Sequence, residues 1–265
     1  MNSKKAFFGA AALALVSLGA LSGCGSDAPV NSATGGSGAN GGSGANGGNS
    51  ANGGTGNVGA ATEPLLPWAV GNTWTYRVTE NGMVSTKTTT VMELTTVGGV
   101  GALKDTPAYL VVTKKGANGN DKTESYQAPD PAEPDRILRY RELSYGAMTG
   151  ALQLEEYWVP ARIHADGSKV GTANWVDSYT EYKLPVGMQA PPGAETHDLW
   201  IVVSADEAID SGGKHYDHAV HLQKTGGSTK DYWYVRGVGK VRETGGQTEE
   251  LLDAKLGTSI NSLKK

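Results

Sequence analysis

The chain has 265 residues, with 23 Lys or Arg against 27 Asp or Glu, and a formal net charge of −4 at pH 7. This mild acidity argues against a nucleic-acid partner, because binding to phosphates needs basic patches that displace counterions. Cys24 is the single cysteine of the chain, so no internal disulfide can form. The fold must be stabilised by burial, for which a domain of about 200 residues has enough surface.

The first 24 residues have the order of a secretory signal peptide: a short basic start, an apolar run and small residues. The sequence Leu21-Ser22-Gly23-Cys24 resembles the lipobox of bacterial lipoproteins. This resemblance implies cleavage before Cys24, lipid attachment to its thiol and acylation of the new amino terminus. We therefore predict a lipoprotein signal peptide over residues 1–23 and an anchor to the membrane through lipid on Cys24.

Two other interpretations of this segment stay open. The apolar run over residues 6–21 is short of the roughly 20 residues that a helix needs to span a bilayer, which disfavours a retained membrane helix. A cleaved signal with an incidental cysteine is the other alternative. Because Gly25 follows Cys24, where an aspartate favours inner-membrane retention in well-studied enteric lipoproteins, the resemblance implies the outer membrane of a bacterial cell envelope.

Residues 24–62 consist of the candidate lipidated Cys24 followed by a low-complexity tract. A Gly-Gly-Ser-Gly-Ala-Asn unit begins at Gly35, repeats at Gly41 and continues as variants. Large apolar residues are almost absent, so burial cannot offset the entropy of ordering this tract, and the collagen period of three is missing. We predict a disordered linker that acts as a flexible tether of roughly 34 Å root-mean-square length.

From residue 63 onward aromatic residues recur in segments typical of strands. Trp74 and Tyr76 alternate with polar residues, and an Asn-Gly turn signal at residue 81 leads to a Thr-rich return strand over 84–94. Asn-Gly tolerates the positive φ of tight turns, so this pattern predicts a β-hairpin. Ten further segments have strand character: 109–113, 122–127, 137–145, 152–159, 175–184, 197–208, 218–224, 230–235, 240–244 and 249–256.

No segment between residues 68 and 256 has a convincing helical spacing of apolar residues. The best helix candidate is 248–256, but the Gly-Gly pair before it favours a strand. We predict a mainly all-β domain over 63–258: a single curved antiparallel sheet of about 10–12 strands, between a half-barrel and a closed barrel. Residues 259–265 are predicted to be a flexible tail.

Two motifs at the ends of this domain resemble uncharacterised bacterial outer-membrane-type lipoproteins. A Gly-Asn-Thr-Trp-Thr-Tyr sequence begins at Gly71, and a Tyr-Trp-Tyr-Val-Arg-Gly-Val-Gly-Lys-Val sequence begins at Tyr232. They match a G-N-x-W-x-Y opening and a W-Y-x-x-G-V-G-x-V closing motif. The resemblance implies an architecture distantly similar to lipoprotein-carrier half-barrels, which have a concave apolar face, and it brings no catalytic residues.

Five aromatic residues of these motifs are candidates to face a ligand: Trp74, Tyr76, Tyr232, Trp233 and Tyr234. Alternation along a strand places Tyr232 and Tyr234 on one face and Trp233 on the other. Aromatic core packing beside a bend at two nearby glycines is the favoured interpretation. An aromatic-lined groove for a lipid, glycan or peptide is the functional alternative.

His215, His218 and His221 form an evenly spaced run. On a strand the middle histidine faces away from the other two, and the spacing matches no standard zinc signature. Surface and sheet histidines are therefore the favoured interpretation. A shared metal would require a bend, which Gly212 and Gly213 permit.

Acidic residues give no clear catalytic pair. Neighbours such as Glu155-Glu156 and Asp206-Glu207 point to opposite faces of a strand, which argues against an acid–base couple. Acidic residues among the prolines over 129–135 indicate an exposed loop, with a calcium site as the minor alternative. The sequence has no nucleophile elbow, phosphate loop or dinucleotide fingerprint. We predict no catalytic residue, no cofactor and no bound metal.

These observations favour a non-enzymatic envelope lipoprotein whose tethered β domain binds a lipid, a glycan or an envelope protein. A hydrolase acting on envelope polymers, with carboxylates gathered in a sheet cleft, is one alternative. A purely structural surface lipoprotein is the other.

Overall fold

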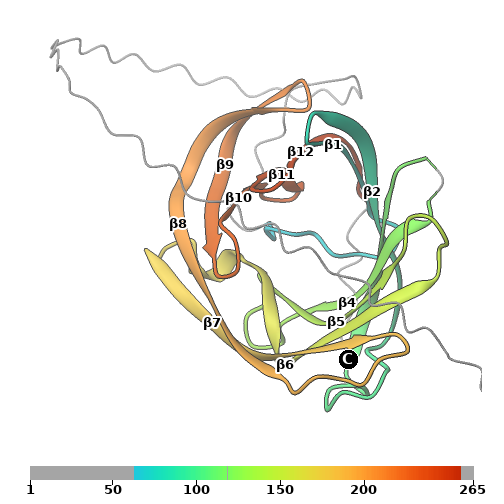
Figure 1. The fold of residues 1–265 in the computed structure, drawn as a ribbon. Coiled ribbons are helices and arrows are strands. Elements are labelled where there is room, and N and C mark those ends of the chain that lie inside the picture. The colour runs from blue at the N-terminus through green and yellow to red at the C-terminus, as the bar shows by residue number, and fades with distance from the viewer. Residues whose placement is uncertain (1–62, 118, 258–265) are drawn as a thin grey trace, which may run out of the picture. The chain divides into compact units, whose positions relative to one another are not determined.

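Twelve antiparallel strands close into a barrel in the computed structural model, which describes residues 63–257 apart from residue 118 (Figure 1). The strands are β1 (Thr73–Glu80), β2 (Met83–Thr96), β3 (Pro107–Lys115), β4 (Asp121–Pro129), β5 (Arg136–Tyr145), β6 (Leu152–Asp166), β7 (Asn174–Pro185), β8 (Ala194–Ser211), β9 (Lys214–Thr225), β10 (Lys230–Val235), β11 (Gly239–Thr244) and β12 (Thr248–Lys255). The predicted signal peptide, Cys24, the linker and the tail from residue 259 lie outside the described residues.

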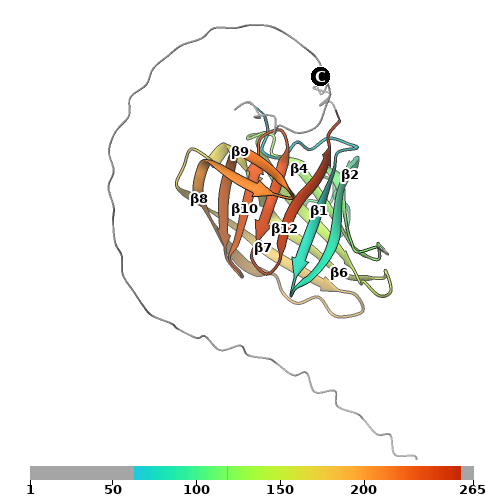
Figure 2. The same cartoon turned by 90° about the horizontal axis from the view of Figure 1, so that it is seen from above.

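Each strand pairs with its neighbours in the sequence, and β1 closes the barrel by pairing with β12. Figure 2 shows β1, β2, β10 and β12 running obliquely across the wall, as strands in a closed barrel must. The prediction of an all-β domain with one antiparallel sheet is confirmed. The sheet closes completely, so the domain is a barrel and not a half-barrel. Residues 248–255, for which the sequence left a helix as the alternative to a strand, form a strand.

The first hairpin shows how the sequence specifies the fold locally. Trp74, Tyr76 and Val78 are buried on one face of β1, while Arg77 between them is exposed. Asn81 and Gly82 have φ of 50° and 76°, the left-handed conformations that a two-residue hairpin turn needs. The turn therefore fixes the register of β1 on β2, in which Trp74 lies opposite Thr89.

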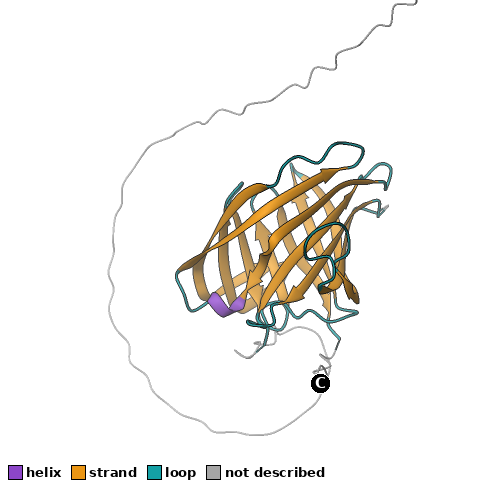
Figure 3. Cartoon of the chain, turned by 90° about the horizontal axis from the view of Figure 1, so that it is seen from below, coloured by secondary structure: helices purple, strands orange, loops and turns teal. Residues whose placement is uncertain are grey.

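Several strands are longer than their sequence patterns indicate. β6 continues to Asp166, although Pro160 lacks the N–H that a ladder needs and usually marks a strand end or a bulge. Beyond residue 159, direct pairing of β6 with β7 stops, so the proline lies where no ladder partner requires its N–H. A short 3₁₀ helix, η1 (Gly167–Lys169), follows β6 (Figure 3). No helix within the described residues has the length and apolar character needed to cross a bilayer.

Residues 63–72, here called the plug segment, close one end of the barrel and cross its interior in Figure 1. Leu65 and Leu66 are buried in a cluster with Trp200 and other inward residues. The Leu65 N–H donates to Asp135 Oδ1 at 2.7 Å, and Asp135 also accepts from Arg236 at 2.6 Å. These contacts tie the plug segment to the loops before β5 and after β10.

The turn of the β8–β9 hairpin packs against β11 and β12. Its Ser211 donates a hydrogen bond to the Val241 carbonyl, and Tyr216 belongs to the same apolar cluster as Val241 and Leu251. Gly212 has φ of +61°, and a Cβ there would lie 1.9 Å from the Leu251 carbonyl oxygen. Glycine is therefore required both for the turn and for this close approach to β12.

Candidate functional site

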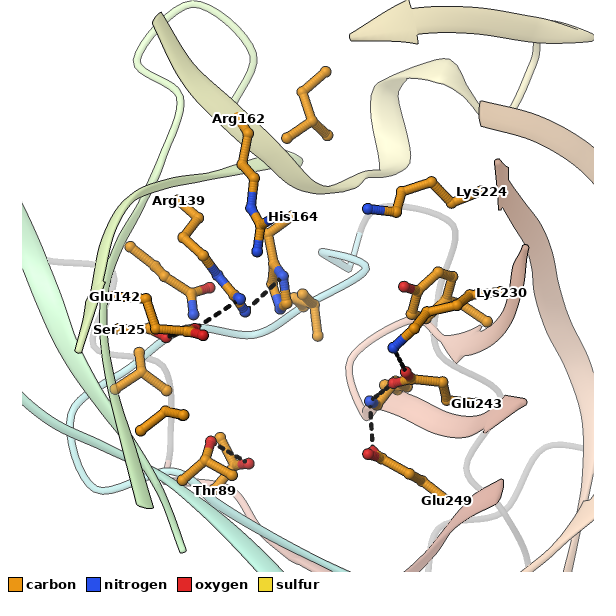
Figure 4. A pocket seen from close by; sticks show the side chains of 18 of the residues that line it. Thr89, Ser125, Arg139, Glu142, Arg162, His164, Lys224, Lys230, Glu243 and Glu249 are labelled. Atoms are coloured by element: carbon orange, nitrogen blue, oxygen red, sulfur yellow. Dashed lines mark hydrogen bonds and ion pairs between the residues drawn. The ribbon is translucent and has the colours of Figure 1, made fainter. Parts of the chain in front are cut away.

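The barrel encloses a cavity of about 670 Å³. It extends from Leu66 and Trp68 of the plug segment toward the turns at the opposite end, where Ser228 and Gln247 line it. Figure 4 shows side chains from β2, β4, β5 and β6 facing those from β9 to β12 across this space. The cavity volume falls within the range of small-molecule sites, roughly 300–1,000 Å³.

Aromatic side chains gather at the plugged end. Those that line the cavity are Trp68, Trp74, Tyr76, Tyr179, Trp200, Tyr232 and Tyr234. The rings of Trp68 and Trp74 lie 5.1 Å apart, and those of Trp200 and Tyr232 lie 5.7 Å apart. Trp74 Nε1 donates to the Val238 carbonyl at 2.6 Å, which fixes its ring against the turn before β11.

Four of the five aromatic residues singled out from the sequence line this cavity: Trp74, Tyr76, Tyr232 and Tyr234. Trp233 does not. It lies on the other face of β10, where it stacks on His221 with ring centroids 4.1 Å apart and donates to Glu207. Trp233, also a candidate to face a ligand, thus lies outside the cavity, on the face that the two-residue period of the strand indicated.

A cluster of lysines and glutamates occupies the wall formed by β10, β11 and β12. Lys240 pairs with Glu249 at 2.7 Å and also with Glu243, while Lys230 pairs with Glu243 at 2.9 Å. Lys87 of β2 pairs with Glu249. This set, called the lysine–glutamate cluster, neutralises most of its own charge.

The pKa values in this cluster follow from burial and from the partners. Burial alone raises the pKa of Glu243, but the charges of Lys240 and Lys230 outweigh it and lower that pKa well below its usual range. Burial opposes the charge on Lys240, yet Glu243 and Glu249 raise its pKa. Burial and the nearby Lys240 lower the pKa of Lys87 to about 8. Both glutamates are thus ionised at neutral pH.

The facing wall carries two arginines and a histidine. Arg139 of β5 donates to Glu142 at 2.8 Å and to His164 Nδ1 at 3.0 Å, and Ser125 donates to the same glutamate (Figure 4). Burial and the Arg139 charge lower the pKa of His164 well below its ordinary value, so its ring is neutral. Nδ1 accepts the arginine's hydrogen bond, which leaves the ring proton on Nε2.

Arg162 of β6 differs from the other buried basic residues. Its guanidinium lies 4.0 Å from the Trp158 ring centroid. Among the described residues, no carboxylate lies within ion-pair distance of it. A cation–π contact offsets a guanidinium charge only in part. Arg162 therefore has no direct ion pair, although its charge helps to lower the pKa of Glu142 and opposes the rise in the pKa of Asp177.

A third group joins β7, β8 and β9. Lys224 donates to Asp198 at 3.1 Å, and the Tyr179 hydroxyl donates to the same carboxylate at 2.8 Å. Asp177 lies opposite Asp198 in the strand register and accepts from the Ile163 N–H at 2.7 Å. Burial, with a further contribution from Asp198, raises the pKa of Asp177 to about 6.

Four buried polar atoms of the cavity lining have no hydrogen-bond partner within the described part of the chain. Three are donors, Trp68 Nε1, Trp200 Nε1 and Arg139 Nε, and one is an acceptor, Gln127 Oε1. A buried polar group without a partner costs about 1–3 kcal/mol. Two more unpartnered donors, Trp175 Nε1 and Arg242 Nε, belong to residues outside the cavity lining, and all six atoms are almost fully shielded from the open space of the cavity.

The three evenly spaced histidines noted in the sequence all lie on β9, and none of them lines the cavity. Each contacts a different aspartate: His215 contacts Asp210, His218 contacts Asp206 and His221 contacts Asp231, at 2.7–3.0 Å. Across residues 63–257, leaving aside residue 118, no group of three or more His, Cys, Asp or Glu is placed to hold a metal ion.

The acidic residues noted in the sequence are likewise dispersed. Glu155 pairs with Arg141, whereas Glu156 lies near Lys183. In the loop before β5, Asp130 pairs with Arg136. Asp135, as described above, holds the plug segment. These carboxylates therefore have structural partners and do not converge on one point.

The charged residues of the cavity were not among the site residues predicted from the sequence. The alternation of inward and outward side chains along each strand is the signal that could have revealed them. Arg139 and Glu142 on β5, and Lys240 and Glu243 on β11, all point inward. Bulges at Arg139/Arg141 and opposite Trp233/Tyr234 shift that alternation by a residue, which hides the inward set from a simple two-residue count.

Comparisons of the chain with protein-family models, with curated proteins and with solved structures find no match. The geometry of the cavity is therefore the basis for a functional proposal.

Proposed function

We propose that this chain is a membrane-anchored envelope lipoprotein whose barrel binds a small ligand in its interior without catalysing a reaction. The observation that carries this proposal is the 670 Å³ cavity with its lining of eight basic and six acidic side chains. Protein interiors are normally packed to the density of organic crystals, and charged side chains are rarely buried in them. A cavity of this size and lining offers a small ligand both room and hydrogen-bond partners.

The anchoring part of the proposal rests on the lipobox at Cys24 and on the Gly-rich tract behind it. Acyl chains each contribute about 0.8 kcal/mol per buried methylene, and two or more hold a protein stably at a bilayer. Labelling with a fatty-acid probe in the wild type and in Cys24→Ala, followed by membrane fractionation, tests this part. Label that persists in Cys24→Ala contradicts it.

The lining favours a small polar ligand among the partners that the sequence suggests. Eight basic and six acidic side chains line the cavity, and a long acyl chain would have to desolvate them. A headgroup, a glycan unit or a small metabolite can instead use them as hydrogen-bond partners. Aromatic rings at the plugged end provide the apolar contact that such sites normally combine with polar groups.

A thermal-shift screen of the full chain tests the binding function. The panel includes small organic anions, cations and neutral sugars. Thr89 lines the cavity, whereas its neighbour Thr88 lies on the outer face of β2. We expect at least one compound class to stabilise the wild type and Thr88→Trp but not Thr89→Trp, whose indole would occupy the cavity. A panel without any stabilising compound would count against a binding function.

A hydrolase remains the second candidate because of one observation. Asp177 has a raised pKa of about 6 and lies opposite Asp198, which is the kind of difference between two carboxyl groups that acid–base catalysis uses. Asp177, however, is not part of the cavity lining and is held by the Ile163 N–H. Hydrolysis of envelope polymers that is lost in Asp177→Asn would favour this alternative over binding. A purely structural role would leave the cavity unexplained.

A further inference from the structure

Three cations of the cavity lie near one another and outside the lysine–glutamate cluster. Arg139 and Arg162 project from β5 and β6, and Lys224 projects toward them from β9 on the opposite wall (Figure 4). Lys224 Nζ lies 5.8 Å from the Trp200 ring centroid, and the Trp68 ring lies 6.3 Å from that of His164, the histidine bonded to Arg139. Three cations and two indoles therefore surround one region of the cavity.

Charge in this region is incompletely neutralised. Arg139 has Glu142 and Lys224 has Asp198, but Arg162 has no carboxylate partner among the described residues. Burial together with the neighbouring positive charges lowers the pKa of His164 and of Lys224, and Arg139 and Arg162 contribute to both shifts. The cations thus repel one another across a shared space. A negative charge placed between them would relieve this repulsion.

The three cationic groups have the matching polarity. Guanidinium and ammonium groups donate hydrogen bonds and accept none. Such donors are suited to carboxylate or phosphate oxygens, and charge-assisted hydrogen bonds are the strong ones. A metal cation or an ammonium ligand would instead be repelled by these three groups.

The aromatic rings define where the rest of the ligand would lie. Trp200 is only 1 % exposed, with the rings of Trp175 and Tyr232 each at 5.7 Å from its own. The partly buried Tyr232 therefore presents an aromatic ring to the cavity, and Trp200 supports it. A rigid aromatic ring of this kind favours a flat or apolar group.

We infer that this region of the cavity is an anion subsite in which Arg139, Arg162 and Lys224 bind the carboxylate or phosphate of an organic anion whose flat body packs on Tyr232. The inference rests on the proposed binding function and specifies its ligand class. It requires no movement of the wall, since the three cations already point into one space.

Calorimetric titration of the full chain with four probes tests this subsite. Phenyl phosphate and indole-3-acetate carry an anion on a flat ring, indole-3-acetamide is the neutral counterpart, and tryptamine is the cationic one. We expect both anions to bind at least tenfold more tightly than the amide, and tryptamine to show no binding. Inorganic phosphate alone is expected to bind more weakly than phenyl phosphate, because it lacks the ring.

Arg162→Met is the decisive variant, since Arg162 has no ion pair and its loss leaves no described carboxylate unpaired. We expect it to weaken phenyl phosphate binding at least tenfold. Arg242→Met is the matched control, because Arg242 lies 5.5 Å from the Trp233 ring on the outer face of the barrel.

The outcomes separate this inference from the proposed function. Equal binding of the anion and the amide, abolished by Thr89→Trp, would overturn the anion subsite and leave the ligand-binding function standing. Unchanged affinity in Arg162→Met would also overturn it. If none of the four probes binds at millimolar concentration, the subsite is wrong, while the binding function is decided separately by the compound panel.

Discussion

Glu249 and Glu250 are consecutive on β12, and they form ion pairs on opposite sides of the barrel wall. Glu249 is 1 % exposed and pairs with Lys240 at 2.7 Å inside the barrel, whereas Glu250 pairs with Arg77 at the same distance outside. Glu249 thus lies in the low-dielectric interior, and Glu250, the next residue, lies at the solvent-facing surface. The two pairs therefore have similar geometry and very different energetic weight.

The first prediction compares these two neighbours. Glu249→Ala leaves Lys240 and Lys87 with less compensation in the interior, and we expect it to lower the free energy of unfolding by about 3–5 kcal/mol. Glu250→Ala should cost less than about 1 kcal/mol, because its partner Arg77 stays solvated. Urea denaturation at pH 7 measures both. Equal costs would show that the interior cluster is not desolvated.

The same cluster predicts the acid limit of stability. Despite burial, which acts in the opposite direction, Lys240 and Lys87 lower the pKa of Glu249 in the folded state. A carboxyl with a lowered folded-state pKa stabilises the fold above its unfolded-state pKa, and that stability is lost as the pH falls. We expect the difference between the wild type and Glu249→Ala to shrink at acid pH. A difference that does not depend on pH would contradict the ionic account.

Asp177 gives the opposite pH dependence. Burial raises its pKa from 3.8 to about 6, so the folded state binds this proton more tightly than the unfolded chain does. The carboxyl therefore destabilises the fold as the pH rises from about 4 to 6, by at most about 3 kcal/mol. Asp177→Asn should be more stable than the wild type at pH 7 by about 2–3 kcal/mol and nearly equal at pH 4. Thermal unfolding at the two pH values checks this, with the exposed Asp105→Asn as a control.

Gly212 and Gly213 test the contact between the β8–β9 hairpin and β12. Both have positive φ, at +61° and +83°, but only at Gly212 would a Cβ meet the Leu251 carbonyl. Gly213→Ala should cost about 1–2 kcal/mol from the left-handed backbone alone. Gly212→Ala should cost at least about 2 kcal/mol more, because the turn between β8 and β9 must move away from the Leu251 carbonyl of β12. Chemical denaturation of both variants measures this difference, and indistinguishable stabilities would mean that the hairpin does not pack there.

The plug segment is expected to contribute strongly to stability. Leu65 is fully buried in the cluster that contains Ile137 and Trp200, so Leu65→Ala should cost about 2–5 kcal/mol. Val70 in the same segment is 55 % exposed, and Val70→Ala should change stability by less than about 0.5 kcal/mol. Guanidinium denaturation measures both. A small effect of Leu65→Ala would mean that the barrel end is closed by other contacts.

The all-β fold was predictable because its signals are local. Alternation in β1 and the positive φ of Asn81 and Gly82 specify a hairpin without reference to the rest of the chain. Closure of the barrel, by contrast, has no local signal, because it depends on pairing between β1 and β12, which lie at opposite ends of the domain sequence. The sequence therefore indicated the number of strands and the sheet type, and the contact between the first and last strands decided the barrel.

The charged interior was not predictable for the same reason. Glu243 lies directly opposite Glu249 in the β11–β12 register, an arrangement that is unfavourable without the lysines between them. Lys240 and Lys87 reach this point from different strands, and only the register brings them together. For Trp233, by contrast, alternation correctly indicated an orientation opposite to that of Tyr232, and Trp233 lies outside the cavity.

The central claim is that the barrel interior holds a small ligand. Its most direct test is native mass spectrometry of the full chain, purified gently from cells that express it, beside Thr88→Trp and Thr89→Trp. We predict a bound small molecule in the wild type and in Thr88→Trp, and a reduced or lost bound mass in Thr89→Trp, whose new indole takes up part of the cavity. The same bound mass in all three proteins, or none in any of them, would contradict the claim.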